Sequence, residues 1–411
     1  MYRREGKLPN KQIFGNFADE AFRVYPATSF KQHQLARKTL VIFTLQILLT
    51  VLVIPSMAQT RHSGHSSSQL DLFFKNNLPQ IISLQSTDTV KVILMGDVMM
   101  HSKQLDKDWK MFFRHMEGRL KSADLAVANL EFPLGGEPYT GYPAFSTPDD
   151  YPEVIADAGI DVFLAANNHI LDRGKAGIER TLDIYHRMRQ SRGILFTGIS
   201  SDEKEDEELY PLIVPVKGIR IALVNFTYGT NSGMDGLWPK VNRMEKADIS
   251  KAIARAKEKK ADYIVALPHW GLEYQLNHSS SQQNMTTWLV DQGVDAIIGA
   301  HPHVVQDTCI IGKVPVVYSM GNAVSNMSIT NSRLELAVTL NFLSRGDGTS
   351  EMLEPKIEFM WCTLPGKLTS SYATIPVKDF IGRRDEWKEP SDYDNMIATY
   401  ERVKKATGIE D

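Results

Sequence analysis

The stretch Ala296-Ile297-Ile298-Gly299-Ala300-His301-Pro302-His303 places two histidines, one residue apart, just after a short apolar run. A continuous apolar run of this kind is typical of a strand buried on both faces. Imidazoles at the end of such a strand are well placed to bind a metal from the edge of a sheet. Other apolar runs are also followed by metal-capable side chains, in the segments Gly96-Asp97, Asn129-Leu130-Glu131, Asn167-Asn168-His169 and Pro268-His269-Trp270. This repeated placement predicts one shared site.

Apolar runs and helical patterns alternate from about residue 89 onward. Strands are predicted at 92–95, 125–127, 162–165, 219–226, 263–267, 296–298 and 314–318. Helices are predicted at 152–158, 175–189, 249–260 and 281–292. The alternation predicts an α/β domain with both sheet faces covered. Ligands of open α/β sheets bind beyond the carboxyl ends of the strands, so the side chains at these ends should converge.

The chain is predicted to have four segments. They are an N-terminal extension with a signal peptide or anchor (1–58), a linker and lead-in (59–88), the main α/β domain (89–345) and a C-terminal part (346–411). The C-terminal part should add strands at 355–364 and 371–375 and a helix at 392–405, packed on the main domain. It contains no obvious catalytic cluster.

The segment Thr39–Ile54 is almost purely apolar and carries no charge. Arg37 and Lys38 precede it, and small residues follow up to Ala58. The pattern predicts a secretory signal peptide cleaved after Ala58, although the preceding 38 residues are more than an ordinary signal peptide has there. Either the true start lies downstream or the segment stays as an anchor, short at about sixteen residues for a spanning helix. Both interpretations place most of the chain outside the cytoplasm, in the periplasm or on the outer face of the cytoplasmic membrane.

Composition excludes some classes of protein. The 411 residues are 43% apolar, which suffices for one large domain or two smaller ones. A net charge of -3 shows no basic excess, so nucleic-acid binding is not expected. Cys309 and Cys362 form no zinc pattern, although a disulfide between them is possible in an oxidising compartment. The acidic run at 201–208 is predicted to be a solvated loop, and the polar stretch at 61–69 a linker that exposes His62 and His65.

The strand-end side chains offer carboxylate, amide and imidazole groups without a thiolate. Such a set suits manganese, iron or zinc better than copper(I) or an iron–sulfur cluster. A carboxylate can bridge two ions, and Glu131 has the place in the order for that role. Two ions about 3.5–4 Å apart can hold a phosphate and activate water for in-line attack.

These motifs resemble those of the calcineurin-like metallophosphoesterases and, more closely, those of the bacterial capsule synthesis protein CapA family, which is associated with poly-γ-glutamate capsules. The resemblance extends over about residues 90–326 and includes Asp172-Arg173-Gly174, Tyr228-Gly229-Thr230-Asn231 and Tyr318-Ser319-Met320-Gly321-Asn322. It implies a four-layer α/β/β/α sandwich, in which two mixed sheets are flanked by helices.

The resemblance also implies a role for each site residue. Asp97 and His303 would hold the first metal, Glu131 would bridge, and Asn168, His269 and His301 would hold the second. His169 would act as an acid or polarise a phosphate, with Asp172 and Arg173 orienting it, and Asn231 would contact substrate. Asp172 and Arg173 could equally form an ordinary salt-bridged loop, and Asn231 could support a glycine-rich turn.

Two departures from the wider phosphoesterase pattern concern the first metal. Met99 stands where that pattern has a histidine, and Glu131 where it has an aspartate. A thioether is a poor ligand for a hard cation, so the first site could be weaker or empty, and one or two ions are expected. His101 could substitute, at a different spacing. Among other residues, Trp270 and Tyr274 could line a groove or belong to the core, whereas His115, His186 and His278 are expected to be structural or exposed.

The resemblance implies an exported protein that acts in the synthesis or export of an anionic capsule polymer such as poly-γ-glutamate. The alternative is a metal-dependent phosphoesterase that hydrolyses a phosphate ester or diester outside the cytoplasm. Expected partners are the anionic polymer or phosphate-ester substrate and a membrane-bound capsule synthesis complex. The sequence leaves open whether the chain is an assembly factor or a hydrolase, because a site can keep its metal and lose its reaction.

Overall fold

A computed structural model describes residues 88–345 and 349–411. Of the described residues, 88–187, 195–345 and 349–411 belong to one compact unit, which contains all of their strands. Residues 188–194, which comprise the end of one helix and the residues just after it, are not part of that unit. No helix within the described ranges is long and apolar enough to cross a membrane.

The predicted export signal lies outside the described residues. This applies to the apolar run 39–54, the cleavage position after Ala58 and the linker 61–69 with His62 and His65. The boundaries of the four predicted segments likewise stay predictions.

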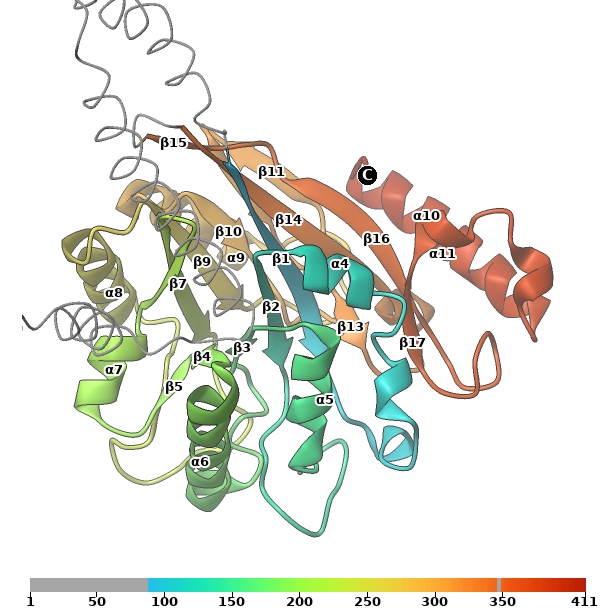
Figure 1. The fold of residues 1–411 in the computed structure, drawn as a ribbon, viewed down its shortest axis with the longest axis horizontal. Helices are drawn as coiled ribbons and strands as arrows, with labels where there is room; N and C mark the ends of the chain where they lie inside the picture. Colours follow the sequence, from blue (N-terminus) through green and yellow to red (C-terminus); the bar gives the residue numbers. More distant parts are fainter. Residues whose placement is uncertain (1–87, 346–348) are drawn as a thin grey trace, which may run out of the picture. The chain divides into compact units, whose positions relative to one another are not determined.

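The first sheet is mixed and has nine strands (Figure 1). They are β1 (Asp88–Val98), β2 (Leu125–Leu130), β3 (Val162–Leu164), β4 (Leu195–Thr197), β13 (Asn322–Val324), β14 (Leu334–Ser344), β15 (Ser350–Met352), β16 (Lys356–Thr363) and β17 (Ala373–Pro376). Strands β1 to β4 run parallel in sequence order, and β13 pairs in parallel with the end of β1. On the other side of β1, strands β14, β16 and β17 are antiparallel neighbours, and β15 pairs with β14.

The second sheet is also mixed and has six strands in the order β11-β12-β10-β9-β7-β6. They are β6 (Leu212–Val216), β7 (Ile219–Thr227), β9 (Tyr263–His269), β10 (Ala296–Ile298), β11 (Thr308–Ile311) and β12 (Val314–Val317). The four central strands are parallel, and β6 and β11 are antiparallel edges. A separate pair consists of β5 (Ile199–Ser200) and β8 (Lys240–Val241).

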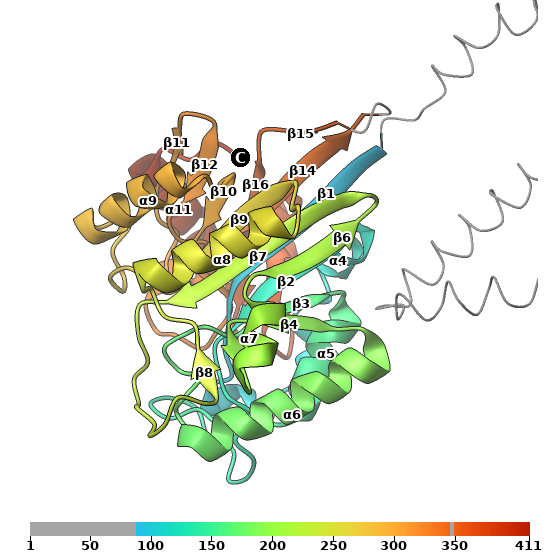
Figure 2. The same cartoon turned by 90° about the vertical axis from the view of Figure 1, so that its left-hand side faces the viewer.

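Helices cover the outer faces of both sheets. They are α4 (Glu117–Ser122), α5 (Asp150–Ala158), α6 (Gly174–Arg192), α7 (Glu203–Leu209), α8 (Lys246–Glu258), α9 (Ser280–Gln292), α10 (Val377–Phe380) and α11 (Pro390–Thr407). Four 3-10 turns, at 102–104, 109–111, 330–333 and 384–386, complete the described elements. Figure 2 shows α8 and α9 on the side of β7 and β9, and α5 and α6 on the opposite side, beyond β2 and β3. The predicted class, two mixed sheets flanked by helices, is confirmed.

The alternation of side chains along β9 decides which of them can reach the site. Ile264 and Ala266 pack in the core shared with α8 and α9. Tyr263 points the other way, because its ring lies 4.6 Å from that of Phe342 in β14 of the first sheet. Since alternate residues of a strand share a face, His269 has the parity of Tyr263 and faces the space between the sheets.

The C-terminal part continues the first sheet. The predicted strands at 355–364 and 371–375 correspond to β16 and β17, and the helix at 392–405 corresponds to α11. Tyr400 of α11 packs against Phe359 of β16, with ring centroids 5.2 Å apart. Strand β16 also pairs directly with β14, so this segment packs on the main domain as part of the first sheet.

The acidic run at 201–208 is not the loop that we expected, because most of it forms α7. Asp202 caps the helix by accepting a hydrogen bond from the backbone N–H of Glu205 at 2.9 Å. Acidic residues in a first turn are favoured by the helix dipole. Asp206 is also buried and forms ion pairs with Lys240 and Arg255, both at 3.4 Å.

Both cysteines are free thiols in this structure, so the disulfide considered from the sequence is absent from the described residues. The Cys309 thiol lies 3.8 Å from the hydroxyl of Tyr318, and the Cys362 thiol lies 3.7 Å from the carbonyl oxygen of Ser325.

Candidate metal centre

A β-bulge turns the side chain of Asp97 into the space between the sheets. Strand β2 offers consecutive partners to Met95 and Asp97, so Gly96 is an extra residue in β1. A bulge reverses the alternation of its strand, and Asp97 thereby shares a face with Asn129, whose Nδ2 donates to Asp97 Oδ1 at 2.7 Å. Only glycine fits at the bulge, because a Cβ on Gly96 would lie 2.0 Å from the carbonyl oxygen of Gly321.

A buried glutamate supports this bulge. Glu335, at the start of β14, accepts a hydrogen bond from the backbone N–H of Gly96 at 2.8 Å. Burial raises the pKa of Glu335 well above its ordinary value, and the nearby charge of Asp97 raises it further, although the bond from Gly96 opposes the shift. This upward shift of the pKa favours the uncharged form of Glu335, which would support the bulge without a second negative charge beside Asp97.

Glu131 follows β2 and is completely buried. Neither of its carboxylate oxygens has a hydrogen-bond partner among the described residues. Its Oε1 lies 3.6 Å from Nε2 of His269, and its Oε2 lies 3.9 Å from Nδ1 of His303. Burying a carboxylate without donors is costly unless a cation compensates the charge. Glu131 therefore fits a metal ligand better than a structural acid.

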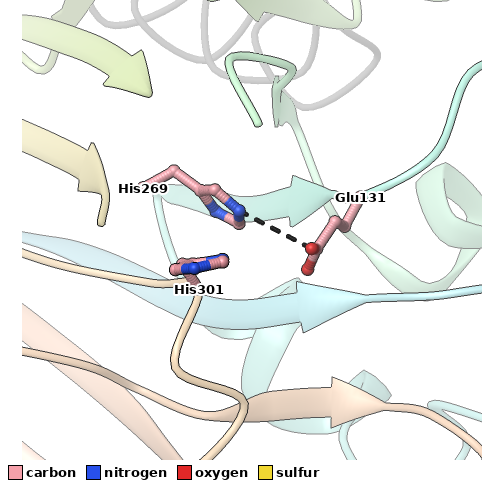
Figure 3. Close-up of side chains that lie close together, drawn as sticks. All are labelled: Glu131, His269 and His301. Carbon is pink, nitrogen blue, oxygen red and sulfur yellow. Dashed lines mark ion pairs between the residues drawn. The ribbon is translucent and has the colours of Figure 1, made fainter. Parts of the chain in front are cut away.

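His269 ends β9 and is 1% exposed. Its Nε2 lies 2.7 Å from Oδ1 of Asn168, and its Nδ1 lies 3.2 Å from Nδ2 of Asn129. Figure 3 shows the rings of His269 and His301 gathered with the Glu131 carboxylate around one space, with the ion pair between His269 and Glu131 dashed. Side chains that could bind a metal therefore meet here from both sheets.

The loop after β10 adopts an unusual backbone to present its two histidines. His301 has a φ of 101° and His303 a φ of 59°, values that are uncommon for residues other than glycine and are concentrated at functional sites. The backbone N–H of His301 donates to Oδ2 of Asp97 at 3.1 Å. Nδ1 of His303 lies 2.9 Å from Oδ1 of Asn322 and 3.5 Å from Oδ2 of Asp97. The strained loop is thus fixed against the end of β1.

Among the described residues, three groups of side chains offer ligand atoms within 4.8 Å of one another. They are Asp97, Glu131 and His303; Glu131, His269 and His301; and Glu273, His301 and His303. Glu131 belongs to the first two groups, as a bridging ligand would. The structure therefore brings together all the predicted metal ligands, including Asn168 through its contact with His269. These oxygen and nitrogen donors suit a hard or borderline divalent ion.

The electrostatics separate the two histidines of the loop. Burial lowers the pKa of His303, but the charge of Glu131 and the hydrogen bond with Asp97 outweigh burial and raise it to about 9. Burial and the neighbouring imidazoles together lower the pKa of His301 well below its ordinary value. Burial raises the pKa of Asp97, but the contacts with His303 and His269 outweigh it, so the net shift is downward. At neutral pH, His303 is a cation and Asp97 an anion.

The structure pairs His169 with Asp172, whose Oδ2 lies 2.7 Å from Nδ1 of the imidazole. Burial lowers the pKa of His169, but the bond to Asp172 and the charge of Glu131 raise it overall. Arg173 does not join this pair: its guanidinium donates to the carbonyl oxygen of Phe145 at 3.2 Å and to the Thr140 hydroxyl. Arg173 therefore shapes the loop beside His169.

Asn231, predicted to contact substrate, lies at the exposed rim of the site. Its Nδ2 is 3.3 Å from Nδ1 of His169, and its Oδ1 accepts from Nδ2 of Asn168 at 3.4 Å. Its backbone N–H also donates to the carbonyl oxygen of Asn168 at 2.8 Å. Both interpretations of Asn231, substrate contact and support of the turn, therefore stay open.

The remaining histidines and aromatic residues divide between core and surface. Trp270 is buried, and its Nε1 donates to the carbonyl oxygen of Tyr318 at 2.9 Å, so the core interpretation is confirmed. Tyr274 is 38% exposed, so it is not a core residue; its ring lies 6.2 Å from that of His303. His115 is exposed. His186 pairs with Glu205, and His278 pairs with Asp307.

Three polar residues of the site were missed from the sequence. Asn129 and Asn322 contact Asp97 and His303, although both lie inside segments that carry the family resemblance. Glu273 lies four residues beyond His269 and reaches both histidines of the following loop. Its position beyond the strand end was a usable signal, because loops at that edge line the site.

Comparisons with known proteins agree with these motifs. A family described as bacterial capsule synthesis protein PGA_cap matches residues 91–327. The capsule biosynthesis protein CapA of Bacillus anthracis is 26% identical over 289 residues, covering 67% of this chain and 69% of that protein. The PGA biosynthesis protein CapA of Bacillus subtilis (strain 168) is 26% identical over 283 residues, covering 66% of this chain and 72% of that protein.

Solved structures with a similar arrangement include two nucleotidases. The NAD nucleotidase NadN of Haemophilus influenzae aligns with a TM-score of 0.43 at 13% identity, covering 78% of this chain and 68% of that chain. The 5'-nucleotidase of Candida albicans SC5314 aligns with a TM-score of 0.40 at 11% identity, covering 78% and 58%.

Proposed function

The chain belongs to the bacterial capsule synthesis protein family, and we propose that it acts in the synthesis or export of an anionic capsule polymer such as poly-γ-glutamate. Two relatives that are named for capsule and PGA biosynthesis share 26% identity with it over about two thirds of its length. A polymer of this kind carries repeated carboxylates, which are ligands for hard divalent ions.

One observation carries the metal site of this proposal: the buried carboxylate of Glu131, which has no hydrogen-bond partner in the described part of the chain, lies among three histidines. In the proposed arrangement, Asp97 and His303 would hold one ion, Asn168, His269 and His301 would hold the second, and Glu131 would contribute to both. Manganese, iron or zinc, when bound, would neutralise an anionic group and polarise it or a water molecule. The protein's own contribution is to fix the ligands between two sheets and to exclude solvent from them.

A second candidate, a metal-dependent phosphoesterase, is favoured by the pair of His169 and Asp172 beside the metal ligands. Asp172 engages Nδ1 of the imidazole at 2.7 Å, and the net pKa of His169 is raised. The upward shift favours the protonated imidazole, and because Asp172 engages Nδ1, the proton available to a leaving group would be the one on Nε2. An assembly factor would have no need of this proton.

Localisation and partners are part of the same proposal. The apolar run 39–54 supports export, either as a cleaved signal peptide or as an anchor on the outer face of the cytoplasmic membrane. There the domain would work beside a membrane-bound capsule synthesis complex. Labelling of intact cells with a membrane-impermeant lysine reagent should modify the protein, and labelling only after lysis would contradict export.

The test combines metal content, turnover and surface polymer. The purified chain should contain a divalent metal by elemental analysis, and metal-free protein that stays so after incubation with manganese, iron or zinc would overturn the metal-site proposal. A phosphodiester and a phosphomonoester are then offered with manganese. His269→Ala should abolish any turnover, whereas His115→Ala should not, because the exposed His115 packs against Phe380 outside the site.

The two candidate functions give different outcomes in cells. A deletion strain complemented with His269→Ala should lack surface polymer if the metal site serves capsule synthesis. Polymer that persists, together with phosphoesterase turnover of the purified protein, would favour the hydrolase over the capsule function.

A further inference from the structure

The loop that follows β9 holds an exposed carboxylate over the two histidines of the β10 loop. This loop, Gly271–Tyr274, is tied to the histidine loop by a hydrogen bond from the backbone N–H of Tyr274 to the carbonyl oxygen of Pro302 at 2.8 Å. Both ends of the loop have a positive φ, 103° at Gly271 and 65° at Tyr274. The position of Glu273 is therefore set by the backbone of both loops.

The carboxylate of Glu273 lies within reach of both histidines of the β10 loop. Its ligand atom and those of His301 and His303 lie within 4.8 Å of one another. Two atoms that both bind one metal at about 2.1 Å lie at most about 4.2 Å apart. A small change of rotamer in the exposed Glu273 side chain would bring its carboxylate from the 4.8 Å limit to that distance. A second observation also indicates an ion beside these histidines. Nδ1 of His301 is buried and has no hydrogen-bond partner among the described residues.

The first metal position, as the sequence resemblance implies it, lacks the histidine of the wider phosphoesterase pattern. Met99 stands at that place in the sequence and is buried at 1% exposure, and its thioether suits soft ions only. His101, the substitute considered from the sequence, is engaged elsewhere, because its Nδ1 accepts a hydrogen bond from the backbone N–H of Asn326 at 3.2 Å. His101 also belongs to none of the metal-capable groups of the described residues.

We propose that Glu273 is a metal ligand that takes the place of the histidine absent at position 99. The carboxylate follows β9 of the second sheet and lies near His303, which also belongs to the group with Asp97 and Glu131. It would therefore help to hold the ion assigned to Asp97 and His303, an inference that rests on the metal site of the proposed function. Replacing a neutral imidazole with a carboxylate makes the position harder and more negative. The position should therefore favour manganese over zinc more than an all-histidine counterpart would.

The test measures manganese binding by the full chain. Electron paramagnetic resonance reports the free Mn²⁺, and elemental analysis reports the bound metal. Glu273→Gln should lower the affinity for the more weakly bound manganese about tenfold or more, and the more tightly bound ion should be retained. Loss of a residue that supports a metal site typically lowers metal affinity by about this factor. Glu354→Gln, at an exposed glutamate between β15 and β16, and Leu272→Ala, next to Glu273 in the loop, should bind as the unaltered chain does. Thermal unfolding checks that every variant folds.

A rescue variant separates ligation from a general loss of charge. Met99→His combined with Glu273→Gln should restore the second manganese if Glu273 replaces that histidine. Unchanged manganese affinities in Glu273→Gln would overturn this inference alone and would assign Glu273 to substrate contact at the rim. An unaltered chain that binds no metal would instead overturn the proposed metal site itself.

Discussion

Metal binding should tighten as the pH rises from 7 to 9, because a proton on His303 competes with the ion. The charge of Glu131 and the hydrogen bond with Asp97 outweigh burial and raise the pKa of His303 to about 9. A coordinating imidazole must be neutral, so binding below this pKa displaces a proton. Each pH unit well below it costs a factor of about ten, or about 1.4 kcal/mol, and at pH 9 about half of the rings are still protonated, so affinity at pH 7 should be about fiftyfold weaker than at pH 9. The dependence should level off well above pH 9.

The assay is calorimetric titration of the metal-free chain with manganese in two buffers that differ in ionisation enthalpy. The difference between the heats gives the protons released, which should be about one per chain at pH 7, from the ion assigned to His303, and near zero well above pH 9. His301 adds no proton, because its pKa lies well below its ordinary value and its ring is neutral throughout. His303→Asn should abolish the release. Affinity that stays flat from pH 7 to 9, with no proton released, would refute the reasoning.

Three further predictions concern stability. Gly96→Ala should lower the free energy of unfolding in urea by about 1–3 kcal/mol or more, because the new Cβ would meet the Gly321 carbonyl oxygen at 2.0 Å. The control Gly118→Ala has open space around the new Cβ and should not destabilise the protein. Arg333→Ala should cost about 3–5 kcal/mol in the same assay, because it leaves Asp392 buried without the guanidinium that binds both its oxygens at 2.7 Å; a cost below about 1 kcal/mol would contradict this. Removal of metal from the loaded chain by a chelator should lower the free energy of unfolding by about 2.7–4.1 kcal/mol if the free ion stood at about 100 to 1,000 times its dissociation constant. An unchanged midpoint of thermal unfolding in the calorimeter would argue against a bound ion.

The sequence was sufficient to predict which side chains that follow parallel strands gather at the candidate site. Glu131 follows β2, His269 ends β9, and His301 follows β10. In each case an apolar run marks the strand, and the geometry of parallel sheets brings the carboxyl ends together. These positions depend only on local pattern plus a general rule, which explains why they could be predicted.

The features that escaped prediction depend on contacts between distant segments. Asp97 is inside β1, and its orientation depends on the bulge at Gly96, which Gly321 and Glu335 support from far along the chain. No local periodicity encodes that pairing. Strand β14 is different, because the alternation from Leu334 to Phe342 was a readable strand signal that we did not use.

Charge balance connects the open question of one ion or two to the loop that carries Glu273. Asp97 and Glu131 are buried, so one divalent ion would balance them once His303 has lost its proton. A second ion would leave an excess of two positive charges in a site with little solvent, which is unfavourable without further anions. Glu273 can supply one negative charge and a bound anionic substrate the rest. The second ion is therefore the one whose binding should depend on both, and this explains how a site without the histidine at position 99 could still bind its full complement when substrate is present.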